Sequence, residues 1–332
     1  MAELTTQSEQ QLKGNGAVTG GVAAHEPRTA DGGLPRPPIS VVILTFNEEV
    51  NIGPCIRSCR WWCDDVHVLD SGSTDRTAQI ARDLGATVHV NKFKSFGDQR
   101  NWAIDNIRCK HPWHFHLDAD ERFTPGLVAE MLRRVKDDGA GEGFDAYHCP
   151  SKMILLDRWL RWSGGYPGYQ VRLFRYGKCR FIDFGHGQRE DCHGAIGTID
   201  EPYMHYGFSK SLAEWFYKHN SYSSREAMEG LALRRSGWRP SSALWKAHGV
   251  QRRREWKNFS YSMRFRWMLR FFYNYILRVG FLDGRSGLRY SLMISTYEYW
   301  TELKIIEEAK PWREKTEALV HRMLGSAAGG RP

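Results

Sequence analysis

The chain is predicted to be an α/β protein with a mainly parallel central sheet and a helical, basic and aromatic C-terminal region. Three observations predict this fold class. Short apolar runs alternate with helical patterns between residues 39 and 117, which is the rhythm of parallel strands joined by right-handed crossover helices. Carboxylates follow two of these runs directly, at 70–75 and 118–121. From about residue 211 the pattern becomes helical.

The elements of the sheet domain follow from the apolar runs and the residues that end them. The first run is short and mostly apolar, which suits a strand covered on both faces. Asn47 is a cap for the helix that follows it, and Gly85 ends the helix after the second strand. The expected order is strand 39–44, helix 47–59, strand 65–69, helix 74–84, strand 87–90, helix 99–107 and strand 113–117.

Composition divides the chain into three expected parts. Residues 1–37, rich in Gly, Ala, Gln, Thr and Pro, are predicted to be a disordered leader. Residues 38–210 hold the sheet domain, whose pattern loosens after about residue 142 into short strands. Residues 211–332 form the helical region. Residues 1–20 lack the apolar segment of a secretory signal, so none is expected there. The sequence contains no run of about 18 apolar residues, so we expect no membrane-spanning helix.

The positive charge is unevenly distributed along the chain. The formal charge is +9, and residues 234–278 alone hold 12 Lys or Arg against the single acid Glu255. Such a block favours an anionic partner: nucleic acid, an acidic membrane surface or a phosphorylated substrate. Residues 256–281 are expected to form a helix with aromatic and basic side chains all round, which suits a membrane interface. A helix packed on the core with its charges in water is the alternative.

The seven cysteines indicate neither a disulfide framework nor a zinc site, because they are scattered and include no CxxC pair. Cys55, Cys59 and Cys63 fall at helical spacing. We expect them to form a small-residue face packed on the sheet rather than a set of metal ligands. This cysteine usage fits a reducing cytoplasm.

Three carboxylates stand at the carboxyl ends of predicted strands: Asp70, Asp118 and Asp120. That edge is where open α/β sheets bind ligands. Asp118 and Asp120 offer the oxygen ligands that a hard divalent cation takes alongside substrate phosphates. The sequence therefore predicts a metal-assisted nucleotide site.

Four motifs occur in an order that is found in a known family: TFNEE at 45–49, LDSGSTDRT at 69–77, FGDQRN at 96–101 and LDADE at 117–121. Together they resemble the family 2 glycosyltransferases, which are inverting enzymes with a Rossmann-like nucleotide-diphosphosugar transferase fold. Within that family the chain is similar to the branch that contains lipopolysaccharide-core β-glucosyltransferases. The resemblance covers about residues 39–210 and, more loosely, residues 281–287.

The resemblance implies that residues of the first strands and of the third helix bind the nucleotide-sugar. Asp70 would accept a hydrogen bond from the nucleobase, and Thr45 and Glu48 would line the nucleotide pocket. Arg100 would reach a phosphate or the donor sugar. Asp118 would lie near the ribose or the metal.

The implied metal is Mg²⁺ or Mn²⁺, which bridges the diphosphate and neutralises charge on the leaving group. Asp120 would coordinate it, with Asp118 close by. His205 matches a histidine that some relatives use near the metal or diphosphate, and a structural role for it is the alternative. His114 and His116 share one face of their strand and are expected to be buried and hydrogen-bonded rather than ligands.

Inverting transfer also needs a carboxylate that takes the proton from the acceptor hydroxyl as it attacks the anomeric carbon. The segment 185–191 is the expected place, because relatives in this branch commonly show a His-Glu pair there. In this chain a glycine follows His186, which moves the acid to Glu190 or Asp191. We favour Glu190, and a surface acid paired with Arg189 is the alternative.

A glycine-rich aromatic stretch precedes this segment and contains Trp162, Tyr166 and Tyr169. Aromatic faces stack on sugars, so the stretch is a candidate platform for the acceptor or the donor. Packing of the rings in the core is an equal alternative.

The expected function is transfer of a hexose, by default glucose from UDP-glucose, to a lipid-linked or lipopolysaccharide-core saccharide. The protein would act in the cytoplasm at the inner face of the cytoplasmic membrane, with its C-terminal region on the anionic lipid surface. A non-catalytic sugar-nucleotide-binding scaffold and a nucleic-acid-binding protein are the alternatives. No nucleic acid partner is expected, since no recognition module accompanies the basic block. A dehydrogenase is disfavoured because no GxGxxG follows the first strand, and a nucleotidyltransferase because its Gly-rich loop is absent.

Overall fold

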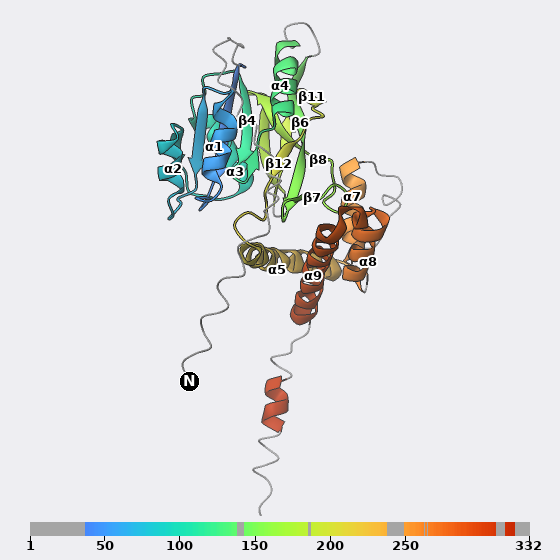
Figure 1. The fold of residues 1–332 in the computed structure, drawn as a ribbon. Coiled ribbons are helices and arrows are strands. Elements are labelled where there is room, and N and C mark those ends of the chain that lie inside the picture. Colours follow the sequence, from blue (N-terminus) through green and yellow to red (C-terminus); the bar gives the residue numbers. More distant parts are fainter. Residues whose placement is uncertain are drawn as a thin grey trace, which may run out of the picture. The chain divides into compact units, whose positions relative to one another are not determined.

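The computed structural model of the chain describes residues 37–137, 143–184, 187–237, 249–261, 263, 265–309 and 316–322. The expected leader, 1–37, lies outside these residues except for Pro37. Figure 1 shows strands with their covering helices in the first two thirds of the described chain and helices in the remainder.

Four parallel strands form the first part of the sheet, in the order β3-β2-β1-β4 (Figure 1). They are β1 (Ile39–Thr45), β2 (Val66–Asp70), β3 (Thr87–Val90) and β4 (Trp113–Asp118). The predicted strands and their parallel pairing are therefore confirmed. The register sets Thr45 beside Asp70 and Leu44 beside Asp118, so the carboxyl ends of three strands meet at one edge.

Helices α1 (Ile52–Arg60), α2 (Thr77–Asp83) and α3 (Phe96–Asn106) connect these strands. The prediction that the first helix begins at Asn47 is wrong. Asn47 has a φ of +52°, in the left-handed region, and belongs to a loop. Helix α3 begins three residues earlier than predicted, because the Ser95 hydroxyl accepts a hydrogen bond from the Asp98 N–H (3.1 Å) and caps the helix there.

The second part of the sheet is mixed rather than parallel. Strand β4 pairs antiparallel with β8 (Gly168–Arg175), which pairs antiparallel with β6 (Phe144–Leu155). Strand β6 pairs parallel with β11 (Ala195–Thr198) and β12 (Tyr203–His205), and β12 pairs antiparallel with β5 (Glu121–Arg122). Helix α4 (Pro125–Asp137) and the short strand β7 (Arg158–Trp159) complete this part. The pairing of β12 with β5 brings residue 205 beside residue 121.

A separate hairpin of β9 (Cys179–Phe184) and β10 (Gly187–Cys192) packs against α3. The Asn101 side chain holds it there, donating to Phe181 O (2.7 Å) and accepting from Phe181 N (3.0 Å). Cys179 and Cys192 face each other across the hairpin and form a disulfide. The expectation that the cysteines form no disulfide is wrong for this pair, because strand pairing rather than a sequence motif brings the two thiols together.

Cys55, Cys59 and Cys63 are buried in the main hydrophobic core, as expected. The first two lie on α1, which packs on the sheet, and the third follows the helix directly. The same core contains apolar residues of β1, β2 and β4. These cysteines are therefore packing residues.

The C-terminal part consists of α5 (Leu212–Arg235), α7 (Gly249–Ser260), α8 (Arg266–Phe272) and α9 (Gly284–Ala309). The predicted single helix over 256–281 is wrong. Phe265 and Val279, with φ values of +60° and +51°, interrupt it. After α8 the chain forms a π-helical turn, η1 (Tyr273–Leu277), and then a 3-10 turn, η2 (Gly280–Asp283). None of the described helices is both long and apolar enough to cross a membrane.

Buried charges tie these helices together. The Arg266 guanidinium pairs with the Glu298 carboxylate on α9 and lies 3.9 Å from Glu226 on α5. Lys257 on α7 pairs with Glu226 at 2.7 Å. Part of the basic block therefore serves internal ion pairs, whereas its residues 238–248 lie outside the described chain.

Candidate active site

The loops that follow β1 and β2 are hydrogen-bonded to each other at the carboxyl edge of the sheet. Asn47 Oδ1 accepts from Thr74 N (2.8 Å), and Asn47 N donates to Ser73 Oγ (2.8 Å). Glu48 N donates to Thr77 Oγ1 (2.7 Å). Asparagine tolerates the positive φ that this arrangement needs. The TFNEE and LDSGSTDRT motifs thus form one preorganised unit.

Asp70, the expected nucleobase acceptor, is buried and organises its own turn. Its carboxylate accepts from Gly72 N (3.1 Å), Ser73 N (2.8 Å) and the Ser73 hydroxyl. Thr45, in register with Asp70, has a buried hydroxyl with no hydrogen-bond partner among the described residues. A buried hydroxyl without a partner is costly, so Thr45 is suited to bind a ligand at this position.

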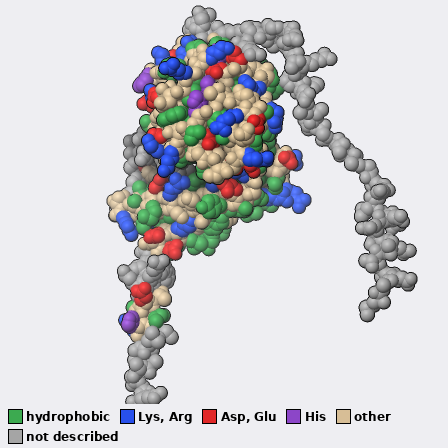
Figure 2. All heavy atoms as spheres, turned by 90° about the vertical axis from the view of Figure 1, so that its left-hand side faces the viewer, with side chains coloured by type: hydrophobic (Ala, Val, Ile, Leu, Met, Phe, Trp, Pro, Cys, Tyr) green, Lys and Arg blue, Asp and Glu red, His purple; other side chains and the backbone are tan. Residues whose placement is uncertain are grey.

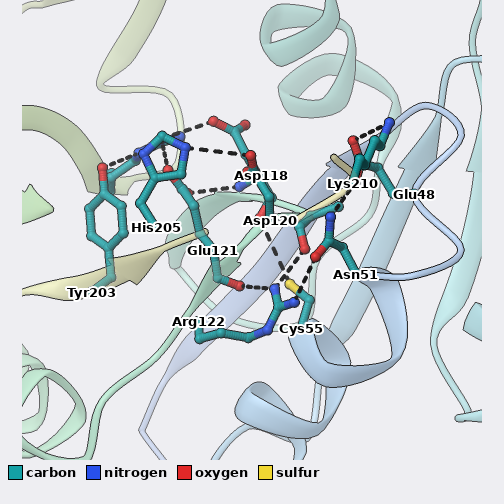
Figure 3. Close-up of polar contacts among 12 residues, drawn as sticks. Glu48, Asn51, Cys55, Asp118, Asp120, Glu121, Arg122, Tyr203, His205 and Lys210 are labelled. Carbon is teal, nitrogen blue, oxygen red and sulfur yellow. Dashed lines mark hydrogen bonds and ion pairs between the residues drawn. The ribbon is translucent and has the colours of Figure 1, made fainter. Parts of the chain in front are cut away.

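Glu48, the other expected pocket residue, is already paired (Figure 3). Its carboxylate contacts Lys210 Nζ (2.7 Å) and accepts from Asn51 Nδ2 (2.7 Å). Burial raises the pKa of Glu48 above its ordinary value, although Lys210 and Asn51 oppose the rise. Lys210 also donates to Phe46 O (3.3 Å), so the chain just before α5 is fixed to the loop after β1.

Asp118 lies between two buried arginines. Its Oδ1 accepts from Arg100 Nη2 (2.8 Å) and its Oδ2 from Arg172 Nη2 (2.9 Å). Arg172 Nη2 also donates to Glu121 Oε1 (2.5 Å), while Glu121 Oε2 accepts from Asp118 N (2.9 Å). Burial raises the pKa of Asp118, but the two guanidinium groups outweigh it and hold that pKa well below its ordinary value. Asp118 is therefore a fixed anion at the end of β4.

The sequence analysis missed Arg172 and Glu121. Arg172 stands in the strand motif YQVRLFR, where a charged residue sits among apolar neighbours and is only 2% exposed. A fully buried arginine requires an anionic partner, and that requirement is the signal that identifies such a residue. Which carboxylates it meets depends on β8 pairing with β4, which the sequence pattern does not reveal.

Arg100 is 2% exposed, and its Nε and Nη1 have no hydrogen-bond partner among the described residues. Its neighbours on α3 face elsewhere: Gln99 donates to Ser71 Oγ (3.1 Å), and Asn101 binds the hairpin. Unpaired N–H groups on a buried cation favour an acceptor from outside the chain, such as a phosphate or sugar oxygen. A phosphate or the donor sugar is the ligand that the resemblance implies for Arg100, and this role stays a prediction.

Asp120 and His205 face each other, with His205 Nε2 3.4 Å from Asp120 Oδ2 (Figure 3). The β12–β5 pairing and the hydrogen bond from Tyr206 N to Asp120 O (2.8 Å) create this contact. Burial lowers the pKa of His205, but the Asp120 carboxylate outweighs it and raises that pKa to about 9. A carboxylate oxygen and an imidazole nitrogen this close fit one divalent cation. Asp118 instead directs both oxygens to arginines.

A cleft of about 340 Å³ opens beside this cluster. Its wall contains both Arg100 and Asp118 and, from the hairpin, Glu190. The lining residues are Phe96, Arg100, Asp118, Tyr169, Gln170, Val171, Phe181, Gln188 and Glu190. Asp191 is exposed and absent from this wall, as expected for adjacent residues of a strand, which point to opposite faces. Gly185 and His186 of the expected segment lie outside the described residues.

His114 and His116 are buried aromatic residues of β4, but the expectation that they are hydrogen-bonded is wrong for three of their ring nitrogens. His116 Nδ1 and Nε2 and His114 Nδ1 have no partner among the described residues. Burial lowers the pKa of His114 to about 4, and that of His116 falls well below its ordinary value. Both rings pack near Phe174 instead.

In the aromatic stretch, two of the three rings are exposed and the third packs against a neighbouring ring. Tyr169 lines the cleft and is 45% exposed, and Trp162 is also exposed. Tyr166 packs edge-on against Trp159, with ring centroids 5.1 Å apart. Tyr169 is therefore the member placed to meet a ligand in the cleft.

Replacing Arg172 by methionine is expected to destabilise the protein by about 3–5 kcal/mol, because Asp118 and Glu121 lose the buried cation that they share. Urea unfolding measures the change. The control is Arg82→Met at an exposed position of α2, which should change stability by less than about 0.5 kcal/mol. Equal effects of the two substitutions would show that the buried cluster does not stabilise the fold.

The chain is similar in sequence to known glycosyltransferases. The family model described as glycosyl transferase family 2 matches residues 40–191. The lipopolysaccharide core biosynthesis glycosyltransferase LpsC of Rhizobium meliloti (strain 1021) is 27% identical over 214 residues, which are 62% of this chain and 76% of that protein. An uncharacterized glycosyltransferase of Rickettsia bellii (strain RML369-C) is 29% identical over 224 residues, 61% of this chain and 70% of that protein.

Among solved structures, glucosyl-3-phosphoglycerate synthase from Mycobacterium tuberculosis in complex with Mn²⁺ and UDP-glucose is 27% identical. The match covers 36% of this chain and 44% of that chain, less than half of either, with a TM-score of 0.28. The family match extends from β1 to the hairpin and contains the strand-end carboxylates Asp70, Asp118 and Asp120. Residues 40–191, slightly less than half of the chain, are thus similar to the glycosyl transferases of family 2, and the α/β sheet described above fits the nucleotide-diphosphosugar transferase fold that this resemblance implies.

Proposed function

We propose that the protein transfers a hexose, by default glucose from UDP-glucose, to a lipid-linked or lipopolysaccharide-core saccharide with inversion at the anomeric carbon. The family match and the similarity to a lipopolysaccharide core glycosyltransferase support this reaction class. The observation that carries the proposal is the cleft, because one wall contains a buried arginine with free N–H groups, Arg100, and a carboxylate suited to act as base, Glu190.

The donor nucleotide is assigned to the carboxyl edge of β1, β2 and β4. There the loops after β1 and β2 are preorganised, and the Thr45 hydroxyl lacks a hydrogen-bond partner within the described part of the chain. Asp70 fixes the turn and keeps acceptor capacity for a nucleobase N–H. Arg100 donates to a diphosphate or sugar oxygen, while Asp118 holds its guanidinium in place.

Asp120 and His205 are assigned to a divalent cation, Mg²⁺ or Mn²⁺. The carboxylate and imidazole are close enough to share one ion, and neither is bound to another side chain as firmly as Asp118 is. When bound, such an ion neutralises charge that develops on the diphosphate leaving group. Asp118 then contributes by orienting Arg100 rather than as a ligand.

Glu190 is assigned as the base. It lines the same cleft as Arg100 and Asp118, on a hairpin that Asn101 fixes to the helix that carries Arg100. Its carboxylate removes the proton of the acceptor hydroxyl while that oxygen attacks the anomeric carbon from the face opposite the leaving nucleotide. The proposed reaction therefore requires that α3 and the hairpin keep their positions relative to each other.

The C-terminal region is assigned to an anionic membrane surface at the inner face of the cytoplasmic membrane. Exposed apolar residues recur along α8 and η1 at helical spacing, i, i+3, i+4, i+7, i+8, i+11 and i+12: Phe265, Met268, Leu269, Phe272, Tyr273, Ile276 and Leu277. We call this set the apolar stripe. It faces away from the protein, and Arg270 on the same helix is exposed beside it. This combination is typical of helices that lie in a membrane interface.

The apolar stripe is part of a wider enrichment of the helical region. Figure 2 shows hydrophobic side chains gathered over the lower part of one face, at the level of α5 and α9. Exposed apolar residues on these helices include Phe216, Tyr217, Leu292 and Leu303. Contiguous apolar surface of this kind marks an interaction site in a protein that is otherwise polar outside.

Glu190→Gln is expected to lower kcat by about 10²–10⁴-fold, because the acceptor hydroxyl loses its base. Release of nucleoside diphosphate from UDP-glucose, with a lipopolysaccharide extract as acceptor, measures the rate. Asp191→Asn is the matched control, since this neighbour lies on the opposite face of β10 and is exposed. A loss for Asp191→Asn and not for Glu190→Gln would reverse the assignment.

Asp120→Asn is expected to weaken Mn²⁺ binding by about tenfold or more, because a charged oxygen ligand is lost. Electron paramagnetic resonance titration of Mn²⁺ in the presence of UDP measures binding without turnover. Asp83→Asn, which removes an exposed carboxylate from α2, is the control. Unchanged Mn²⁺ affinity in Asp120→Asn would remove this residue from the metal site.

The double variant Leu269→Asp/Leu277→Asp is expected to lose about tenfold or more of its binding to phosphatidylglycerol vesicles, since each leucine contributes about 1.5–3 kcal/mol when buried. Co-sedimentation measures it. Val90→Asp, at an exposed apolar position of β3, is the control and should bind like the unchanged protein. Full vesicle binding by the double variant, or binding to RNA alone, would rule out the apolar stripe as the docking surface.

A further inference from the structure

The motif FLDGRSG at 281–287, which resembles the family only loosely, has a defined structural partner. Asp283 in η2 is 8% exposed and accepts hydrogen bonds from three consecutive backbone N–H groups. They are Arg161 N to Oδ1 (3.1 Å), Trp162 N to Oδ2 (3.0 Å) and Ser163 N to Oδ2 (2.7 Å). The Ser163 hydroxyl donates to the same Oδ2 (2.7 Å). One carboxylate thus closes a turn that lies 120 residues earlier in the chain.

The glycines of this region allow the close approach. A Cβ on Gly280 would lie 2.4 Å from Asn274 O and 3.1 Å from Ser163 Cβ. A Cβ on Gly287 would lie 2.1 Å from Gly280 O and 2.8 Å from Asp283 Cβ. A larger residue at Gly280 would collide with the backbone of η1, and one at Gly287 with η2. The two glycines therefore allow the close packing of η1, η2 and α9 around Asp283.

The turn lies shortly before a strand that lines the cleft. Residues 164–167 connect it to β8, whose residues Tyr169, Gln170 and Val171 line the cleft wall. The next residue, Arg172, binds Asp118. Strand β8 is itself paired with β6, so the turn and this pairing together hold the start of β8.

We assign Tyr169 and Gln170 to the acceptor side of the cleft, and Arg100 and Asp118, which line the same cleft, to its donor side. The nucleotide edge is built from the loops after β1, β2 and β4, and none of the contacts of Asp283 given above involves those loops. Tyr169 and Gln170 share the cleft with Glu190, the assigned base. In an inverting transfer the base must touch the acceptor hydroxyl, so residues beside it meet the acceptor.

The turn also presents a cationic and aromatic surface. The Arg161 guanidinium lies over the rings of Trp159 and Trp162, 5.4 Å and 5.0 Å from their centroids. Trp162 is exposed. Aromatic faces with an adjacent guanidinium suit a saccharide that carries anionic groups. Asp283 sets the orientation of this surface by holding the backbone beneath it.

We propose that Asp283 is a positioning residue for the acceptor saccharide: it holds the 161–163 turn, which precedes the Tyr169 wall of the cleft, and none of its contacts given above is to a residue assigned to the donor. The proposal rests on the proposed function. The neighbouring Leu282 is 59% exposed, so the 3-10 turn that carries Asp283 also presents an apolar side chain to the surface.

The test compares Asp283→Asn, which keeps the side-chain volume, with Ser163→Ala, which removes one of the hydrogen bonds, and with Glu308→Gln, an exposed carboxylate on α9, as control. Transfer of glucose from UDP-glucose is measured against increasing amounts of a lipopolysaccharide and lipid extract from cells that lack this protein. Hydrolysis of UDP-glucose without acceptor is measured in parallel. Hydrogen exchange of the 161–163 amides reports whether the turn is held.

Asp283→Asn should speed exchange of these amides and raise the acceptor concentration for half-maximal transfer about tenfold or more, with Ser163→Ala intermediate. Donor hydrolysis should stay within about twofold of the unchanged protein. Faster exchange with an unchanged acceptor requirement would overturn the proposal, as would an equal loss of donor hydrolysis and transfer. A protein that hydrolyses UDP-glucose but transfers none to the extract would refute the proposed function itself, and the acceptor role with it.

Discussion

The buried ion cluster around Asp118 is the interaction on which the rest of the site depends. Arg100 comes from α3, Arg172 from β8 and Glu121 from β5, so one carboxylate at the end of β4 joins four elements. Removing any one charge leaves the remaining charges unbalanced in a largely buried place, which is costly. The same contacts hold Arg100, whose Nε and Nη1 lack a partner among the described residues, so the proposed donor contact and the stability of the fold would depend on one set of ion pairs.

Helix α3 contacts three different parts of the site. Successive residues contact different partners: Gln99 the turn after β2, Arg100 the carboxylate of β4, and Asn101 the hairpin. Because these three residues lie on one helix turn, the same rigid element holds Arg100 and the hairpin that carries Glu190, which we propose as donor contact and base. Gly97 contributes as well, since a Cβ there would lie 2.9 Å from Asp183 of the hairpin.

The C-terminal helices are tied to the catalytic domain at two separate points. Lys210 fixes the start of the helical region to the loop after β1, through Glu48 and Phe46 O. Asp283 fixes η2 to the turn before β8. In the proposed site, the first tie would lie on the donor side and the second on the acceptor side. The helical region is therefore a structural support for both walls of the site as well as a surface with exposed apolar residues.

The sequence by itself determined the parallel strands β1 to β4 and the strand-end carboxylates, because apolar periodicity and turn residues are local signals. It also indicated Arg100 and favoured Glu190 over Asp191, and the cleft wall contains the favoured residue. Only the tertiary structure decided the partners of Asp118, the contact of Asp120 with His205, the Cys179–Cys192 disulfide and the break after α8. Each of these depends on antiparallel pairing or packing between distant segments, and long-range pairing leaves no periodic trace in the residues that make it.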